Sequence, residues 1–195
     1  MFAELLTDRV AGICRLSPDQ VCRLEQHYGL LVCWNRVLNL TGIRTVEDAV
    51  ERHYCESLFL AAHLPPGKLT VADIGSGAGF PGVPVAILRP YCHVTLIESR
   101  QRKAAFLKEA SRELGNVRVL AERAESIAET FDWVISRAVK YSEIGPALKR
   151  LGRNAELLSG ELQLSDMRGF DWQPPIRLPW GTRRYLYVSR ETGST

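Results

Sequence analysis

The chain has 195 residues, of which 46% are hydrophobic and 24% charged, and its formal net charge at pH 7 is +3. This composition is ordinary for a soluble globular protein with one sizeable core. No apolar run approaches the roughly 18 residues that span a membrane, and the first residues lack the basic and apolar regions of a signal peptide, so we expect a cytoplasmic protein with no membrane partner.

The beginning of the chain is predicted to be helical. Ser17, followed by Pro18 and Gln20, is typical of a helix start, with Ser17 as the N-cap. An apolar period follows, and the polar segment 39–42 ends this helix. A second helix is predicted over Thr45–Leu64, before a break made by two prolines and a glycine.

Strands and helices alternate later in the chain. Strands are predicted, in chain order, at Leu69–Ile74, Val94–Glu98, Val117–Leu120, Trp133–Ser136, Glu156–Leu158 and Arg183–Arg190. Helices are predicted between them, a short one up to Pro90, one over Arg100–Leu114 and one ending near Leu148. This order is typical of an α/β fold with a mostly parallel sheet and helices on both faces. We expect residues 1–67 to form a helical N-terminal extension and residues 68–195 the core of one structural domain.

A glycine-rich loop connects the first predicted strand to the short helix. It begins at Asp73, contains Gly75, Gly77 and Gly79, and lies where a nucleotide-binding loop is found. Glycines let the backbone turn tightly and approach a ligand closely. Glu98 ends the next strand, where a carboxylate can accept hydrogen bonds from two ribose hydroxyls. These five residues are therefore predicted to bind a cofactor.

Two cofactors compete for this loop. Gly77, Gly79 and Gly82 match the G-x-G-x-x-G fingerprint of an NAD-dependent oxidoreductase, and Glu98 follows Gly77 by 21 residues. Against this, a carboxylate of Asp73 at the mouth of the loop would repel a pyrophosphate, and the prolines near the helix start lack N–H groups. S-adenosylmethionine has no phosphate and carries an ammonium and a sulfonium, so we favour it. A non-catalytic cofactor-binding or RNA-binding protein is a third hypothesis.

Several motifs together resemble one family of enzymes. They are Asn39-Leu40-Thr41, Arg52-His53, Ser57-Leu58, the loop from Asp73 to Gly82, and Ile135-Ser136-Arg137-Ala138. Over roughly residues 30 to 150 the chain resembles the RsmG (GidB) family of bacterial methyltransferases, which modify N7 of a guanine in small-subunit (16S) ribosomal RNA. The resemblance implies a Rossmann-like class I methyltransferase fold, S-adenosylmethionine as cofactor, and ribosomal RNA or the small ribosomal subunit as partner.

The resemblance also implies roles for particular residues. Gly75 and Phe80 would line the cofactor pocket, Ala124 and Glu125 would flank the adenine, and Arg137 would face the cofactor or the target base. The sequence departs from the family pattern at Glu56, where Asp is usual, and at Ser159, where Lys is common before the glycine. Residues 160–180 match poorly.

The residues near the end of the fourth strand bear on the acceptor atom. Ser136-Arg137-Ala138 stands where enzymes that methylate exocyclic amines often carry an Asn/Asp-Pro-Pro-aromatic motif. A cysteine nucleophile for carbon methylation is also missing there, since the last cysteine is Cys92. Guanine N7 has a lone pair and no proton to remove, so alignment suffices. We name no catalytic base, and expect Arg137 to position guanine O6 or the cofactor carboxylate. His53 is predicted to pack or cap, and Asn39 and Thr41 to fix a turn.

Three cations are candidates for RNA binding. Arg100, Arg102 and Lys103 lie at the start of a predicted helix, where positive charge opposes the helix dipole and a polyanion would relieve it. Residues 136–195 carry ten Lys and Arg against six Asp and Glu, the source of the net charge. The alternative interpretation is a solvated face.

The cysteines and histidines indicate no metal site. Cys14, Cys22, Cys33, Cys55 and Cys92 form no C-x-x-C pair, and no histidine completes a zinc pattern with them. Scattered cysteines are typical of free thiols in a reducing compartment. We expect no metal, and a monomer.

Overall fold

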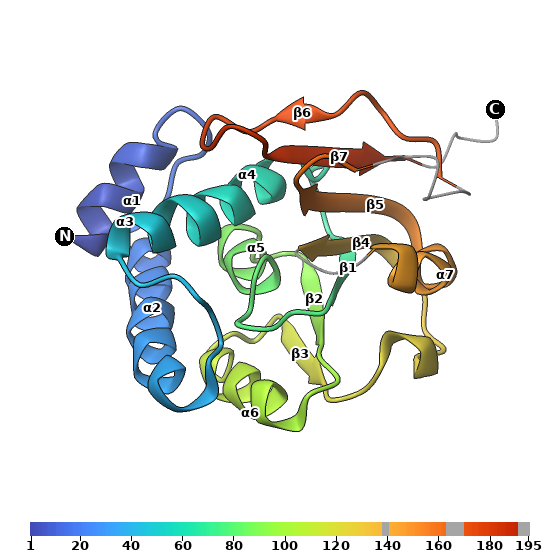
Figure 1. The fold of residues 1–195 in the computed structure, drawn as a ribbon, viewed down its shortest axis with the longest axis horizontal. Coiled ribbons are helices and arrows are strands. Elements are labelled where there is room, and N and C mark those ends of the chain that lie inside the picture. The colour runs from blue at the N-terminus through green and yellow to red at the C-terminus, as the bar shows by residue number, and fades with distance from the viewer. Residues whose placement is uncertain (138–140, 163–169, 191–195) are drawn as a thin grey trace.

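The computed structural model describes residues 1–137, 141–162 and 170–190. Seven strands of these ranges form one sheet in the order β3-β2-β1-β4-β5-β7-β6 (Figure 1). Their bounds are β1 Thr70–Ile74, β2 His93–Ile97, β3 Val117–Leu120, β4 Phe131–Arg137, β5 Gly152–Ser159, β6 Ile176–Arg177 and β7 Tyr185–Ser189. Strands β1 to β5 pair in parallel, and β7 lies antiparallel between β5 and β6. The prediction of a mostly parallel sheet is confirmed. Strand β6 was not predicted from the sequence.

Helices cover both faces of the sheet, as predicted. They are α1 Phe2–Val10, α2 Pro18–Leu38, α3 Val46–Ala49, the π-helical turn η1 Val50–Cys55, α4 Glu56–His63, α5 Gly82–Leu88, α6 Gln101–Ala110, the 3-10 turn η2 Ala124–Ser126 and α7 Tyr141–Leu151. Neighbouring residues of β1 enter different cores because side chains alternate along a strand. Val71 packs in the core shared with α1, α2, α4, α5 and α6, and Ala72 in the core shared with η2 and α7. Figure 1 shows α2 and α7 on opposite sides of the sheet.

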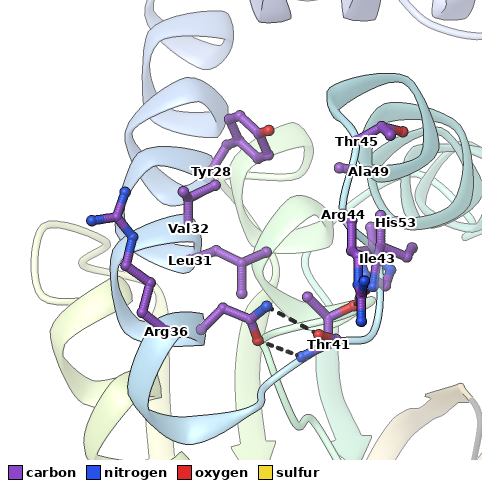
Figure 2. Close-up of a pocket in the computed structure, with 11 residues that line it drawn as sticks. Tyr28, Leu31, Val32, Arg36, Thr41, Ile43, Arg44, Thr45, Ala49 and His53 are labelled. Carbon is purple, nitrogen blue, oxygen red and sulfur yellow. Dashed lines mark hydrogen bonds between the residues drawn. The ribbon is translucent and has the colours of Figure 1, made fainter.

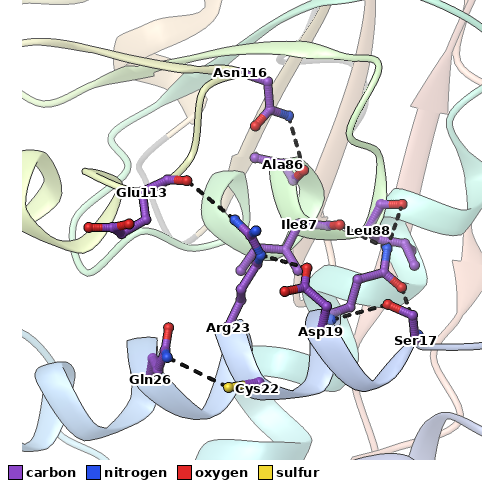
Figure 3. Close-up of polar contacts among 11 residues, drawn as sticks. Ser17, Asp19, Cys22, Arg23, Gln26, Ala86, Ile87, Leu88, Glu113 and Asn116 are labelled. Carbon is purple, nitrogen blue, oxygen red and sulfur yellow. Dashed lines mark hydrogen bonds and ion pairs between the residues drawn. The ribbon is translucent and has the colours of Figure 1, made fainter.

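Helix α2 joins the N-terminal extension to the core. Ser17 and Gln20 form the predicted capping box, and the Gln20 side chain also donates to the Ile87 carbonyl at the end of α5, at 2.9 Å. Further along α2, Arg23 donates to the Glu113 carbonyl at 3.3 Å (Figure 3). Helix α1, which the sequence analysis did not predict, adds Phe2 to the same core. The extension therefore shares one hydrophobic core with the sheet.

The helix expected over Thr45–Leu64 is present but not regular. Thr45 caps it, and a π-helical turn over Val50–Cys55 separates α3 from α4. The residues that pack against this turn explain why the segment is not a regular α-helix. Tyr54 contacts Phe2 of α1, whereas His53 stacks on Phe80 of the glycine loop. Because successive residues pack against different elements, the wider turn suits this segment better than a one-sided α-helix.

Helix α6 ends four residues earlier than the predicted bound at Leu114. Its last residue is Ala110, and Ser111 is the C-cap. The Ser111 hydroxyl donates to the Leu107 carbonyl at 2.7 Å, a bond that competes with continued helix. In the ranges that the structure describes, no helix combines the length and apolar character needed to cross a membrane.

Candidate functional site

The glycine loop is tied to the end of strand β2. The N–H groups of Gly75 and Ser76 both donate to the Ile97 carbonyl, at 2.9 and 3.1 Å. Gly75, Gly77 and Gly79 have φ values of 73°, 56° and 88°, in the left-handed region that other residues adopt at a cost. The loop therefore depends on glycine at three alternate positions.

Glu98 holds the loop and the start of α6 together. Its Oε2 accepts the Gly77 N–H at 3.0 Å, and its Oε1 accepts the Arg100 N–H at 2.8 Å. The residue is only 7% exposed. Each carboxylate oxygen has a second acceptor site, so Glu98 can still accept a hydrogen bond from a ligand hydroxyl.

Asp73 lies beneath the loop rather than at its mouth, which corrects the sequence-based argument for electrostatic repulsion of a pyrophosphate. The side chain is fully buried and its Oδ2 accepts the Gly82 N–H at 3.0 Å. Burial raises the pKa of Asp73 to about 7, against the opposing effect of hydrogen bonds from Ser76 and Gly82. The close approach requires glycine, because a Cβ at Gly82 would lie 2.6 Å from Asp73 Oδ2 and 2.3 Å from Leu96 Cδ2.

The N-terminus of α5 offers a different argument against a dinucleotide. A pyrophosphate binds to free N–H groups at a helix N-terminus. Here the Gly82 N–H is bonded to Asp73, and the Val83 N–H donates to the Gly79 carbonyl at 2.8 Å. Pro81 and Pro84 have no N–H. The first turn of α5 therefore presents no free donor for a phosphate.

Phe80 joins the loop to the N-terminal extension. Its ring stacks on His53, with centroids 4.4 Å apart, and meets Tyr54 edge-on at 5.0 Å. The residue is 6% exposed. The Phe80 ring is therefore enclosed by the extension, and only the backbone of this residue belongs to the loop edge.

Arg137 ends β4 and is bound by His53. Arg137 Nη1 donates to His53 Nδ1 at 2.8 Å, and His53 Nε2 lies 2.7 Å from Thr41 Oγ1. Burial, together with the charge of Arg137, lowers the pKa of His53 to about 3, so the ring is neutral. An arginine can only donate, so the proton of His53 is on Nε2 and points to Thr41. The packing role predicted for His53 is confirmed, but its bond to Arg137 was not predicted.

Thr41 is itself held by α2. The Asn35 amide donates to the Thr41 carbonyl at 3.0 Å and accepts the Thr41 N–H at 2.8 Å (Figure 2). Asn39, with φ 47°, is the left-handed C-cap of α2. The turn role predicted for Asn39 and Thr41 is confirmed. A hollow of about 250 Å³ lies between α2 and the segment 41–49, and His53 reaches its wall.

Glu56 is a site residue that the sequence reasoning noticed only as a departure from a family pattern. It is 2% exposed and accepts two hydrogen bonds from Arg184, at 2.9 and 2.6 Å. Its Oε2 also lies 3.5 Å from Arg137 Nε. A signal was available, because Glu56 is the sole charged residue between His53 and His63 in an otherwise apolar segment.

Four adjacent strand ends bring most of the predicted site residues to one edge of the sheet. The glycine loop follows β1, Glu98 follows β2, η2 follows β3 and Arg137 ends β4. Ala124 in η2 is buried, its carbonyl accepts from Arg150 at 2.7 Å, and Glu125 is exposed. The carboxyl edge of a parallel sheet is where α/β proteins bind their ligands.

The predicted RNA-binding cations lie at the same edge. Arg100 is the N-cap of α6, and Arg102 and Lys103 belong to its first turn. Arg100 and Arg102 are exposed, and Lys103 is half-buried. Cys92 precedes β2 and so lies at the opposite edge of the sheet. Within residues 1–137, 141–162 and 170–190, no group of three or more His, Cys, Asp or Glu side chains is placed to hold a metal ion.

Comparisons with known proteins agree on one family. The family model for rRNA small subunit methyltransferase G (GidB) matches residues 20–158. Proteins called ribosomal RNA small subunit methyltransferase G are similar in sequence. The one from Nitrosospira multiformis is 41% identical over 77% of this chain and 70% of its own length. The one from Chromobacterium violaceum is 39% identical over 92% of this chain and 85% of its own length.

Solved structures agree on the fold. A SAM-dependent methyltransferase from Aquifex aeolicus has a TM-score of 0.58 at 17% identity, covering 73% of this chain and 92% of that one. A fibrillarin pre-rRNA processing protein from Methanococcus jannaschii has a TM-score of 0.52 at 16% identity, covering 65% of this chain and 68% of that one. At such identities the likeness concerns the fold alone, which is the Rossmann-like methyltransferase fold.

Proposed function

The chain belongs to the GidB family of rRNA small subunit methyltransferase G, and from this premise we propose that it methylates N7 of a guanine in small-subunit (16S) ribosomal RNA. Its methyl donor is S-adenosylmethionine. The observation that carries the proposal is the edge where four parallel strands end, with Glu98 beside the glycine loop and with no free N–H donor in the first turn of α5.

The residues at this edge fit the methyl donor. Asp73 Oδ1, buried under the loop, has no hydrogen-bond partner among the described residues, and such a carboxylate suits a ligand with net positive charge. We assign the ribose hydroxyls to Glu98. Backbone contacts come from the loop, and the adenine lies beside η2. The proposed cofactor-binding residues are Asp73, Gly75, Gly77, Gly79, Phe80, Glu98, Ala124, Glu125 and Arg137.

The side chains near Arg137 favour N7 as the acceptor. The bound donor supplies an electrophilic methyl group, and N7 supplies a lone pair without losing a proton. Ser136 is not a base, because its hydroxyl is buried and donates to the Ile74 carbonyl at 2.7 Å. His53 accepts from Arg137 and stays neutral. What the chain contributes is alignment, with the Arg137 guanidinium positioned to bind guanine O6.

Transfer of labelled methyl groups tests the proposal. We expect label in small ribosomal subunits or naked 16S rRNA, and 7-methylguanosine after digestion to nucleosides. Label on another atom would refute the assignment of N7. Cofactor binding without transfer would favour the non-catalytic hypothesis, and calorimetry with NAD and S-adenosylmethionine tests the oxidoreductase alternative.

The cations at the start of α6 are proposed to contact RNA phosphates. Replacing Arg100, Arg102 and Lys103 together by Ala should weaken RNA binding and reduce the slope of log affinity against log salt by about 2, since fewer counterions are released. Lys108→Ala, at the other end of the same helix, is the matched control. An unchanged slope in the triple variant would assign these cations to a solvated face.

The remaining parts of the proposal concern the assembly. We propose that the protein is a cytoplasmic monomer that needs no metal, and that the extension 1–67 and the core 68–195 fold as one unit. Sedimentation at several concentrations tests the monomer, and activity after chelation tests the metal. A chain starting at residue 68 should not fold, because α2 and α4 share their core with the sheet.

A further inference from the structure

A second hollow adjoins the site, between the N-terminal extension and the loop that joins β6 to β7. Its volume is about 660 Å³, which is within the range of small-ligand sites. Its walls come from segments 42–56 and 180–184, together with Arg137. Arg137 therefore borders both this hollow and the loop edge, whereas the glycine loop does not line the hollow.

The charges at the floor of the hollow do not cancel. One buried carboxylate, that of Glu56, faces two guanidiniums, those of Arg137 and Arg184. Other charged residues around the hollow form separate ion pairs, Arg52 with Asp48, Arg9 with Glu51, and Arg183 with Glu161. The floor therefore carries one excess positive charge, and an anion entering the hollow would neutralise it.

Both guanidiniums have donors to spare. An arginine has five N–H donors. The hydrogen bonds in the described part of the chain use two of them in Arg184 and one in Arg137. The Arg137 side chain is 11% exposed, and its Nε has no hydrogen-bond partner there. This Nε is enclosed and faces Glu56, so the donors that Arg137 can offer to a ligand are the remaining N–H groups of its two terminal nitrogens.

The loop between β6 and β7 is shaped to place Arg184. The Leu178 N–H donates to the Arg184 carbonyl at 3.0 Å and closes the loop. Gly181 has φ 76°, and a Cβ there would lie 3.0 Å from Arg184 Cγ. Trp180 lines the hollow and meets Phe59 edge-on at 6.3 Å. A flat aromatic side chain therefore lines the same hollow as the two guanidiniums.

We propose that this hollow binds a phosphate-bearing nucleotide of the RNA strand, next to the guanine that is methylated. Its phosphate contacts Arg184 and one donor of Arg137, whose other free donors remain for guanine O6, and its base packs against Trp180, as bases stack on aromatic side chains in single-stranded RNA sites. Glu56 is the positioning residue that holds both arginines. The proposal rests on the proposed function, because the nucleotide belongs to the substrate of that reaction.

A double variant tests the role of Arg184 without changing the net charge of the floor. Replacing Glu56→Gln and Arg184→Gln together keeps an amide pair and the net charge of the floor but removes the guanidinium. We expect the KM for RNA to rise about tenfold or more, the range for losing a charged contact to a phosphate, with S-adenosylmethionine affinity changed little and the melting temperature above that of Glu56→Gln alone. The matched control is Arg177→Gln, an exposed arginine of β6 outside the hollow.

The outcomes of this experiment are distinct. An unchanged KM in the double variant would overturn the inference, and so would an equal rise in Arg177→Gln. If the double variant unfolds, Arg184→Lys replaces it, and a smaller rise in KM of about fivefold is expected because Lys keeps the positive charge but lacks the planar fork. Failure of the wild-type protein to methylate rRNA would refute the proposed function. The direct binding test below would still show whether the hollow binds a nucleotide.

Direct binding identifies the ligand chemistry. The full chain is titrated with guanosine 5′-monophosphate, guanosine and inorganic phosphate, each followed by nuclear magnetic resonance. We expect the monophosphate to bind tightest, and its binding to weaken about fivefold or more in Trp180→Leu and in Arg184→Lys. Equal binding of inorganic phosphate would reduce the hollow to an anion site, and no detectable binding of the monophosphate would overturn the proposal.

Discussion

Two parts of the site are built in opposite ways. The loop edge, made of residues 73–82 and Glu98, is held by backbone N–H groups and by the small size of glycine. The arginine cluster, made of Arg137, Arg184, Glu56 and His53, is held by side-chain charges and hydrogen bonds from three segments that are distant in the chain. A backbone site is sensitive to added atoms, whereas a charge cluster is sensitive to a missing partner. The two parts should therefore fail in different ways.

Loss of the Glu56 carboxylate should have the largest effect on stability. Glu56→Gln leaves Arg137 and Arg184 without a counter-charge, and breaking a buried ion pair on one side costs about 3–5 kcal/mol of unfolding free energy. Chemical denaturation measures it. Glu56→Gln combined with Arg184→Gln should be more stable than Glu56→Gln alone. Equal stabilities would show that the cluster is not energetically coupled.

An added methyl group should have the next largest effect, at the loop edge. Gly82→Ala places a Cβ into Leu96 and Asp73, so the short helix α5 must move away, at a cost of about 3 kcal/mol and with weaker cofactor binding. Gly29→Ala is the control, since a Cβ in α2 meets nothing within 4 Å. That change should stabilise the chain by about 0.5–1 kcal/mol. Normal cofactor binding by Gly82→Ala would contradict the tight fit.

Glu98→Ala separates the cofactor from the RNA. It should weaken S-adenosylmethionine binding by about 1–3 kcal/mol, the range for a hydrogen bond to a charged group. RNA affinity should fall less than cofactor affinity, because Glu98 does not line the hollow that Arg184 borders and touches the start of α6 only through the Arg100 N–H. Calorimetry measures the affinity for the cofactor, and filter binding measures the affinity for RNA. Equal losses of both affinities would mean that the loop edge and the arginine cluster form one site.

The smallest effect should be the pH dependence of cofactor binding. Burial raises the pKa of Asp73 to about 7, and a cofactor with net positive charge favours the ionised carboxylate. Affinity should therefore rise severalfold, up to about tenfold, from pH 6 to pH 8, and Asp73→Asn should remove the rise. Calorimetry at three pH values measures it.

Turnover should not follow the same pH dependence. The pKa of His53 is lowered to about 3, so His53 does not titrate near neutrality. Single-turnover rates at saturating cofactor and RNA should then be nearly flat from about pH 6.5 to 8.5. A tenfold rise per pH unit that one His or carboxylate substitution abolishes would reveal a general base.

Much of the fold was predictable because its signals are local. The capping box at Ser17 and Gln20, the glycine loop after β1 and the place of Glu98 after β2 each depend on a short window of sequence and are found where they were predicted. Other features depend on neighbours that are remote in the chain. The π turn over Val50–Cys55 follows from packing against α1 and the glycine loop. The burial of Asp73 follows from its bond to the Gly82 N–H, at the start of α5.

By itself the sequence determined the alternating order of strands and helices, the left-handed loop and the acidic residue after β2. Backbone conformation is set by residues close in the chain, so these features need no knowledge of the fold. Only the tertiary structure decided which side chains share the arginine cluster. Glu56 and Arg184 are 128 residues apart, and His53 and Arg137 are 84 apart. They meet because β4 and β7 flank β5 in the sheet while α4 packs across it, and no local pattern records that arrangement.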